Sequence, residues 1–211
     1  MTWSPFSKIW KLFGKYFILA NFLYIFSLYI YLYMNVGIIG SGGRESSICF
    51  SLSKSKKVDK IFCMPGNGGT ENMSKNLKID INNFQEIKNT IEKYKIDLIV
   101  VGPEKPLVDG IVDFFENSNV KIFGPNKAAS QLEGSKIFTK NLCQKYNIPT
   151  AKFGIFKNSE ESKNFINDSS FPIVIKADGL ASGKGVYISE NIQEAHTAVD
   201  EIFNGKFGEA K

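Results

Sequence analysis

Histidine and arginine are almost absent from this chain. Among its 211 residues, His196 is the only histidine and Arg44 is the only arginine. A Ser–His–Asp triad needs a histidine beside its nucleophile, and a histidine-rich metal site needs several. His196 lies in the helical pattern NIQEAHTAVDEIF, where we expect it at the surface or at the edge of a core. The composition therefore excludes both kinds of site.

Cysteine is scarce as well. Cys49, Cys63 and Cys143 form no C-x-x-C pair, and each has apolar neighbours in the sequence. This pattern is typical of reduced, buried thiols in a cytosolic protein, and it indicates neither a disulfide framework nor a metal site. We therefore expect a cytoplasmic protein with no metal ligands within this chain.

The chain also lacks the charge pattern of a nucleic-acid-binding protein. Its formal net charge is +5, and three of the lysines (Lys8, Lys11 and Lys15) lie in the first 33 residues, which contain no acid. The remaining residues are close to neutral and contain no basic stripe interleaved with aromatic residues. We expect no nucleic-acid partner.

The first 33 residues are unlike the rest of the chain. The segment 16–33 is uncharged for 18 residues and follows the three lysines, which suits a membrane helix. No small-residue cleavage site follows it, so a signal peptide is disfavoured. Met34 opens a strand pattern with no linker before it, and a buried strand there would be pressed against the bilayer. We expect 1–33 to be upstream sequence with the true start at Met34; the alternative is a membrane anchor through 16–33.

Two familiar phosphate-binding motifs are missing. The stretch FPIVIKADGLASGKGVYIS has three residues between Gly179 and Gly183, whereas a P-loop needs four, and strand-type residues follow where a P-loop has a helix. The stretch instead predicts a hairpin whose glycine-rich tip can fold its backbone amides over an anion. Lys184 at the tip and Lys176 at the end of the first strand would add positive charge. The alternative interpretation is an ordinary mobile hairpin with exposed lysines.

Strand and helix patterns alternate from Met34 onward. Such repeated βα units predict an open parallel α/β sheet, and ligands bind such sheets at the carboxyl ends of the strands. We expect strands at 36–40, 60–64, 78–80, 97–102 and 120–124, and helices at 45–53, 82–94 and 106–118, the last opened by Pro106.

Three glycine-rich turns follow strands of this sheet. The first fails as a dinucleotide fingerprint, because its glycines do not give G-x-G-x-x-G and the second strand ends without an acid. A nicotinamide-dependent oxidoreductase is therefore excluded. Three amide-rich turns at one sheet edge favour a phosphorylated sugar or a similar ligand. They contain Gly40, Gly42, Gly43, Arg44 and Glu45; Gly66, Asn67, Gly68, Gly69 and Thr70; and Gly102, Pro103 and Glu104.

After Gly124 the pattern becomes that of an α+β unit. A short helix and a longer one at 135–146 precede a strand at 151–156, a helix at 159–168, the lysine-bearing hairpin and the helix that contains His196. We expect domains at 34–139 and 140–211, the second of which stops without a closing strand.

These residues resemble one family. From Met34 to Lys211 the chain is similar to phosphoribosylamine–glycine ligases (glycinamide ribonucleotide synthetases) of the ATP-grasp superfamily. The matching stretches are NVGIIGSGGRE, PGNGGT, DLIVVGPEKPLVDGIVD, KIFGPNKAASQLEGSKIFTK, NIPTAKF and PIVIKADGLASGKGV. The resemblance implies a Rossmann-like sheet of the pre-ATP-grasp type, followed by the start of an ATP-grasp domain.

The resemblance also assigns roles to residues. The three turns of the sheet would bind phosphoribosylamine, Lys136 and Lys176 would bind ATP, and Ser46 stands where the family usually has histidine. The flap over the ATP phosphates would be formed by Gly179, Ser182, Gly183, Lys184 and Gly185. No catalytic residue is assigned.

The reaction implied by the resemblance joins glycine to 5-phosphoribosylamine. ATP phosphorylates the glycine carboxylate, and the amine attacks the acyl phosphate to give glycinamide ribonucleotide, ADP and phosphate, a step of de novo purine biosynthesis. The family also implies Mg²⁺ or Mn²⁺, whose ligands we expect beyond Lys211 together with the glycine pocket. We therefore expect this chain to be inactive alone. The alternatives are another ATP-grasp carboxylate–amine ligase and a non-catalytic nucleotide-binding fragment; the oligomeric state stays open.

Overall fold

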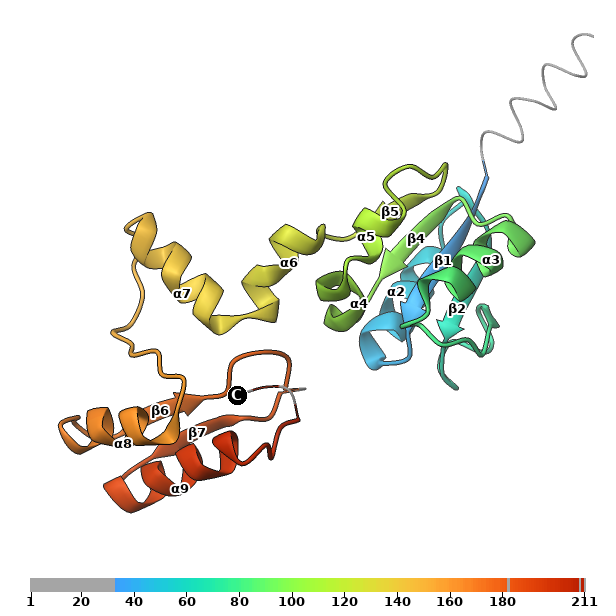
Figure 1. The fold of residues 1–211 in the computed structure, drawn as a ribbon. Helices are drawn as coiled ribbons and strands as arrows, with labels where there is room; N and C mark the ends of the chain where they lie inside the picture. The colour runs from blue at the N-terminus through green and yellow to red at the C-terminus, as the bar shows by residue number, and fades with distance from the viewer. Residues whose placement is uncertain (1–32, 182, 209, 211) are drawn as a thin grey trace, which may run out of the picture. The chain divides into compact units, whose positions relative to one another are not determined.

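The computed structural model describes residues 33–181, 183–208 and 210 in two compact units. The first unit contains the described residues up to Gly102 together with Asn117–Phe123, and the second contains Pro103–Glu116 and the residues from Gly124 onward (Figure 1). Within these described ranges, no helix is both long enough and apolar enough to cross a bilayer. Except for Tyr33, the expected anchor lies outside the described residues, so the expected start at Met34 stays a prediction.

The first unit is built on a parallel sheet, which confirms the expected fold class. The strand order is β3-β2-β1-β4-β5, and every neighbouring pair is parallel. Parallel sheets have both faces covered, so their central strands are apolar throughout; accordingly, Val36, Ile38 and Ile39 on β1 are fully buried. The strands are β1 (Met34–Gly40), β2 (Val58–Pro65), β3 (Lys75–Asn76), β4 (Leu98–Val101) and β5 (Lys121–Phe123).

Helices α2 (Gly43–Ser53) and α3 (Phe84–Tyr94) cover opposite faces of this sheet (Figure 1). Neighbouring side chains of a strand point to opposite faces. On β2, Cys63 packs in one cluster with Cys49 of α2, whereas the Phe62 ring lies 5.0 Å from the Tyr94 ring of α3. Both thiols are buried and free, as expected, whereas Cys143 is free but only half-buried. Burial raises the pKa of Cys63 to about 11.

The expected third strand at 78–80 is wrong. The strand is β3, at Lys75–Asn76, where Asn76 accepts hydrogen bonds through its Oδ1 from Thr70 Oγ1 at 2.8 Å and from Ser74 Oγ at 3.1 Å. The Leu77 amide still donates to Cys63 O at 2.8 Å, and the chain then leaves the sheet. Polar contacts made by the preceding turn, rather than apolar alternation, therefore decide where this edge strand forms.

The helix expected at 106–118 is also wrong in its bounds. It is divided into α4 (Glu104–Asp109) and α5 (Ile111–Phe114) by Gly110, which has a φ of +97°. A left-handed residue of this kind ends a helix, and glycine adopts this conformation without steric cost. Pro106 is the third residue of α4 and not its first.

The second unit continues with helices that begin at polar capping residues. Asn126, Ser135, Asn158 and Asn191 each accept a hydrogen bond from a backbone amide of the first helical turn. This pattern is the usual start of a helix, and it explains why the sequence located these four helices. They are α6 (Lys127–Gly134), α7 (Lys136–Lys145), α8 (Ser159–Asn167) and α9 (Ile192–Phe203).

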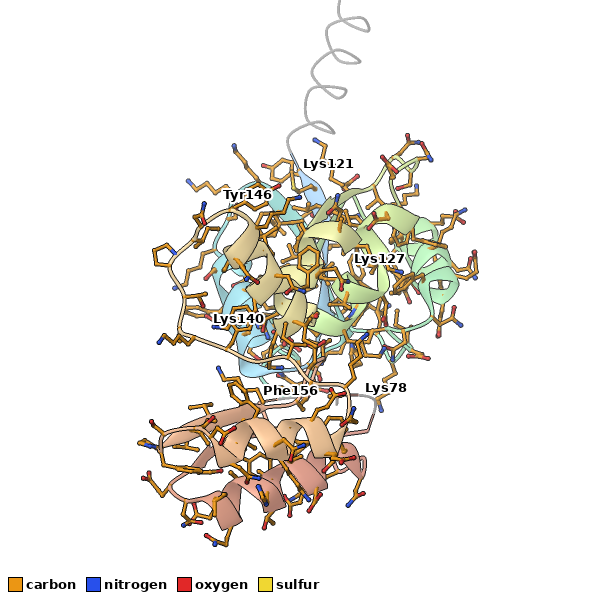
Figure 2. The ribbon with its side chains drawn as sticks, turned by 60° about the vertical axis from the view of Figure 1, so that its left-hand side comes forward. Lys78, Lys121, Lys127, Lys140, Tyr146 and Phe156 are labelled. Atoms are coloured by element: carbon orange, nitrogen blue, oxygen red, sulfur yellow. The ribbon has the colours of Figure 1, made fainter. Side chains whose placement is uncertain are left out.

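The expected strand at 151–156 does not form. This segment pairs with no described strand, and its start is instead held by Lys140, whose side chain is labelled in Figure 2. Lys140 Nζ donates to Thr150 Oγ1 at 2.6 Å and to Ala151 O at 3.2 Å. Alternating apolar residues need a partner strand to form a ladder, and none is adjacent among the described residues.

The hairpin predicted from the glycine-rich stretch is confirmed. Strands β6 (Ile173–Lys176) and β7 (Val186–Ser189) are antiparallel, with Val174 opposite Ile188 and Lys176 opposite Val186. One face of the hairpin packs on Ile166, Ala195 and Val199 of α8 and α9.

Substituting Ile38 with alanine should destabilise the first unit. Ile38 is fully buried on β1, and removing its side chain leaves a cavity that costs about 2–5 kcal/mol of unfolding free energy. Phe50→Ala on α2 is the control, because Phe50 is 51% exposed and should cost only about 0.5 kcal/mol. Urea denaturation followed by circular dichroism measures both, and equal losses would contradict the assignment of β1 as the centre of the core.

Candidate functional site

The three glycine-rich turns of the first unit meet at one edge of the sheet. Because β1, β2 and β4 are parallel neighbours, the loops that follow them begin side by side. The Gly66 amide donates to Gly40 O at 3.1 Å, and the Gly102 amide donates to Ile39 O at 3.0 Å. The structure thus brings together eleven predicted residues: Gly40, Gly42, Gly43, Arg44, Glu45, Gly66, Asn67, Gly68, Gly69, Thr70 and Gly102. Pro103 and Glu104 belong to the second unit, where Glu104 begins α4.

The Glu45 side chain fills the space between two of these turns. It is only 4% exposed, and its Oε2 accepts a hydrogen bond from the Gly42 amide at 2.6 Å. Its Oε1 lies 3.6 Å from Arg44 Nε and accepts no hydrogen bond from any described residue. A Cβ added at Gly102 would lie 1.9 Å from Oε1, and one at Gly40 would lie 2.7 Å from Glu45 Cδ. A side chain at either position would therefore displace the Glu45 carboxylate, which occupies that space.

Asn67 links the second turn to the first. Its Nδ2 donates to Ser41 O at 2.8 Å and to Gly42 O at 3.1 Å. Its Oδ1 accepts from Ser46 Oγ at 2.9 Å and from the Gly69 amide at 2.7 Å. These contacts engage both ends of the amide group, so Asn67 holds the turns in place. Ser46, the residue after Glu45, takes part in this linkage.

Part of this edge stays open. A Cβ added at Gly43 or Gly68 would meet no atom within 4 Å, and both residues are exposed. Gly43 is the first residue of α2, whose first amides have no partner within the helix. A helix N-terminus beside a second amide-bearing turn is suited to an anionic group. The geometry therefore separates residues that organise the edge from those that leave it accessible.

The loop between β6 and β7 has the backbone of a glycine-dependent tip. Gly179, Gly183 and Gly185 have φ values of +93°, +76° and +74°, which residues with a side chain rarely adopt. The Ala177 amide donates to Gly185 O at 2.9 Å and closes the base of the loop. Lys184 is exposed. Ser182 lies outside the described residues, so its predicted role is not placed.

The face of the hairpin turned away from α8 and α9 combines charge with apolar surface. Lys176 lies on this face and is exposed, and among the described residues its ammonium group has no ion pair or side-chain hydrogen bond. Val174, Val186 and Ile188 share the face and are 51%, 49% and 67% exposed. The sequence reasoning missed these three residues, although alternation along both strands could have identified them. A basic group beside apolar residues is suited to a nucleotide.

Contacts behind the hairpin hold it to the segment after α9. The Tyr187 hydroxyl donates to Glu201, and Lys206 Nζ donates to Glu201 Oε2 at 2.6 Å. The hydrogen bonds from Lys206 and Tyr187 lower the pKa of Glu201, whereas burial and the bond to Glu201 raise the pKa of Tyr187. Glu201 therefore stays ionised and bridges β7 to the last described residues.

Lys136 lies at the base of the loop, and its predicted nucleotide role stays a prediction. Its Nζ donates to Gly179 O at 2.9 Å, and Asp178 contacts the first turn of the same helix, α7. The structure thus joins two segments that are 43 residues apart in the sequence. Asp178 is a fourth residue that the sequence reasoning missed, and no local pattern identified it.

Two family models match this chain in succession. The N domain of phosphoribosylglycinamide synthetase matches residues 34–133, and the ATP-grasp (A) domain of the same enzyme matches residues 134–211. The chain is 46% identical to phosphoribosylamine–glycine ligases of Clostridium acetobutylicum and Mesorhizobium japonicum, covering 82% and 84% of this chain. It spans only 42% of each of those relatives.

Solved structures give the same relationship. A phosphoribosylamine–glycine ligase from Thermotoga maritima superposes with a TM-score of 0.67 at 32% identity, over 84% of this chain and 41% of that one. An N5-carboxyaminoimidazole synthetase from Staphylococcus aureus, complexed with ADP, has a TM-score of 0.61 at 17% identity, over 79% of this chain and 45% of that one, which supports the fold alone. Because the two matched models together account for residues 34–211, the chain belongs to the phosphoribosylglycinamide synthetase family.

Proposed function

We propose that this chain forms the phosphoribosylamine side and the phosphate flap of a phosphoribosylamine–glycine ligase. The observation that carries the proposal is the hairpin. Lys176, which has no ion pair among the described residues, and a glycine-rich loop lie together in a chain that is 46% identical to two phosphoribosylamine–glycine ligases. The enzyme would join glycine to 5-phosphoribosylamine through a glycyl phosphate. The cytoplasmic location expected from the sequence stays a prediction.

ATP would bind at the hairpin and at the start of α7. Lys176, Lys184 and Lys136 would neutralise phosphate oxygens, and the loop amides would add hydrogen bonds to the same oxygens. Val174, Val186 and Ile188 offer an apolar surface to the nucleoside. Support for ATP as the nucleotide comes from the match to an ATP-grasp domain and from the ADP bound to the Staphylococcus aureus enzyme of the same fold.

The flap would also protect the intermediate. Glycyl phosphate is an acyl phosphate, which water hydrolyses unless the site is closed. The loop between β6 and β7 is long enough and glycine-rich enough to fold over phosphates. The open edge at Gly43 and Gly68 would hold the phosphorylated sugar, with Glu45 and Asn67 keeping the turns in register.

The described residues contain no set of ligands for the divalent metal that the family implies. Among the described residues, no group of three or more His, Cys, Asp or Glu side chains could hold a metal ion. No step is therefore assigned to a metal in this chain, and the ligands expected beyond Lys211 stay a prediction.

Lysine substitutions in the hairpin should reduce ATP turnover. In a protein extended to the length of the relatives, Lys176→Ala and Lys184→Ala should each lower kcat for ADP release by about 10²–10³, because a donor to transition-state charge is lost. Lys121→Ala on β5, an exposed lysine labelled in Figure 2, is the control and should leave turnover unchanged. Unchanged turnover in both hairpin variants would remove the nucleotide assignment.

Residues 34–211 alone should bind ATP weakly and release no ADP. Without the metal ligands and the glycine pocket expected beyond Lys211, the triphosphate is poorly neutralised and the acyl phosphate is unprotected. The extended protein should release ADP only when glycine, 5-phosphoribosylamine and Mg²⁺ are all present. A coupled ADP assay compares the two proteins, and steady turnover by 34–211 would show that the chemistry lies within this chain.

A further inference from the structure

Helix α7 begins with a charge that its own sequence does not balance. Lys136 is its first residue, and no acid lies in its first turn. A helix N-terminus carries partial positive charge, so a cation there is unfavourable and a nearby anion is favourable. The next two helices of this unit begin differently: α8 has Glu160 and Glu161 in its first turn, and α9 has Glu194. Any anion at the start of α7 therefore comes from elsewhere in the chain.

Asp178 supplies that anion from the base of the flap. Its Oδ1 accepts the Ile137 amide at 3.0 Å, and its Oδ2 accepts Ser135 Oγ at 3.0 Å. Ser135 Oγ in turn accepts the Phe138 amide at 3.0 Å, as the capping residue of α7. The carboxylate thus satisfies one first-turn amide directly and orients the side chain that satisfies another.

A second contact joins the same two segments. Lys136 Nζ donates to Gly179 O at 2.9 Å. Lys136 follows Ser135 and Gly179 follows Asp178, so this hydrogen bond runs beside the contacts of Asp178. Asp178 itself is held from the hairpin side, because Ala177 is fully buried in a cluster with Ile202 and Ala210. The start of α7 and the base of the flap are therefore connected at two points, one through the Asp178 carboxylate and one through the Lys136 side chain.

We propose that Asp178 is a positioning residue of the nucleotide site, which fixes Lys136 and the base of the flap relative to each other. This inference rests on the proposed nucleotide function of Lys136. Holding a long lysine side chain in place before the ligand arrives reduces the ordering cost of binding. When phosphate arrives, the ammonium group exchanges a neutral carbonyl for a charged acceptor, which is the stronger partner. Without Asp178, the first turn of α7 loosens and Lys136 loses its position.

The test uses Asp178→Ala and Asp178→Asn in this 211-residue chain. ATP is titrated and its Kd is measured from NMR shifts, which follow weak binding. Asp178→Ala should raise the Kd by about 5- to 30-fold, the effect of losing one or two such contacts. Asp178→Asn keeps the shape and one acceptor oxygen, so its Kd should fall between those of the other two proteins. An unchanged Kd in Asp178→Ala would overturn the proposal.

Asn126→Ala is the matched control. Asn126 caps α6 of the same unit by accepting the Ala129 amide at 2.9 Å, yet it makes no contact with the flap among the described residues. This variant should destabilise α6 without changing the Kd for ATP. If Asn126→Ala raises the Kd as much as Asp178→Ala does, the effect reports general loosening and the positioning role is wrong.

A double variant distinguishes positioning from direct contact with ATP. Lys136→Met removes the group that Asp178 is proposed to position, so adding Asp178→Ala to it should raise the Kd no further. A full additional rise would show that Asp178 acts independently of Lys136.

Hydrogen exchange is a measurement that needs no nucleotide. Asp178→Ala should increase the exchange rate of the Ala177 amide, which donates to Gly185 O and makes no hydrogen bond with Asp178. Unchanged exchange there would overturn the link to the flap even if the wild-type chain bound no ATP and the proposed function failed.

Discussion

Parallel pairing around the buried strand β1 is the constraint on which the rest of the first unit depends. Because β2 and β4 run beside it in the same direction, all three following loops start at one edge of the sheet. The loops then need close packing, which the Glu45 carboxylate and the Asn67 amide provide. The glycines at 40 and 102 follow from this packing, since any side chain there would collide with Glu45. One topological fact thus explains a set of residues that looks, in sequence, like several separate motifs.

In the second unit, a charged side chain holds two distant segments together. A lysine at the first position of a helix is electrostatically unfavourable unless an anion lies nearby. Asp178 meets that need, and its place beside Gly179 ties the lysine to the loop that would cover the same phosphates. The buried cluster of Ala177, Ile202 and Ala210 and the bridge through Glu201 keep the base of the loop fixed. Only the tip of the loop then has the backbone conformational freedom that glycine allows and that a flap requires.

The sheet edge of the first unit and the hairpin of the second unit differ in what they leave accessible. At the sheet edge, most of the side chains that stand out in the sequence are engaged in holding the turns, and the open positions are glycines. On the hairpin, the side chain of Lys176 is itself the accessible group, with apolar neighbours beside it. Backbone amides therefore face the proposed sugar phosphate, whereas lysine side chains face the proposed nucleotide. This difference explains why a chain with a single arginine and a single histidine can still be suited to phosphorylated ligands.

The sequence alone determined the open parallel sheet, the four capped helices and the glycine hairpin with Lys176 at its strand end, because each is encoded by local periodicity, capping residues or glycines. The sequence motifs also identified the family to which the chain belongs. Only the tertiary structure decided the edge strand at Lys75–Asn76, the division of α4 from α5 and the absence of a strand at 151–156. It also decided that Glu45 is buried and that Asp178 caps a helix that begins 42 residues before it. These features depend on which distant groups become neighbours, and a polar contact across such a separation leaves no periodic signal in the chain.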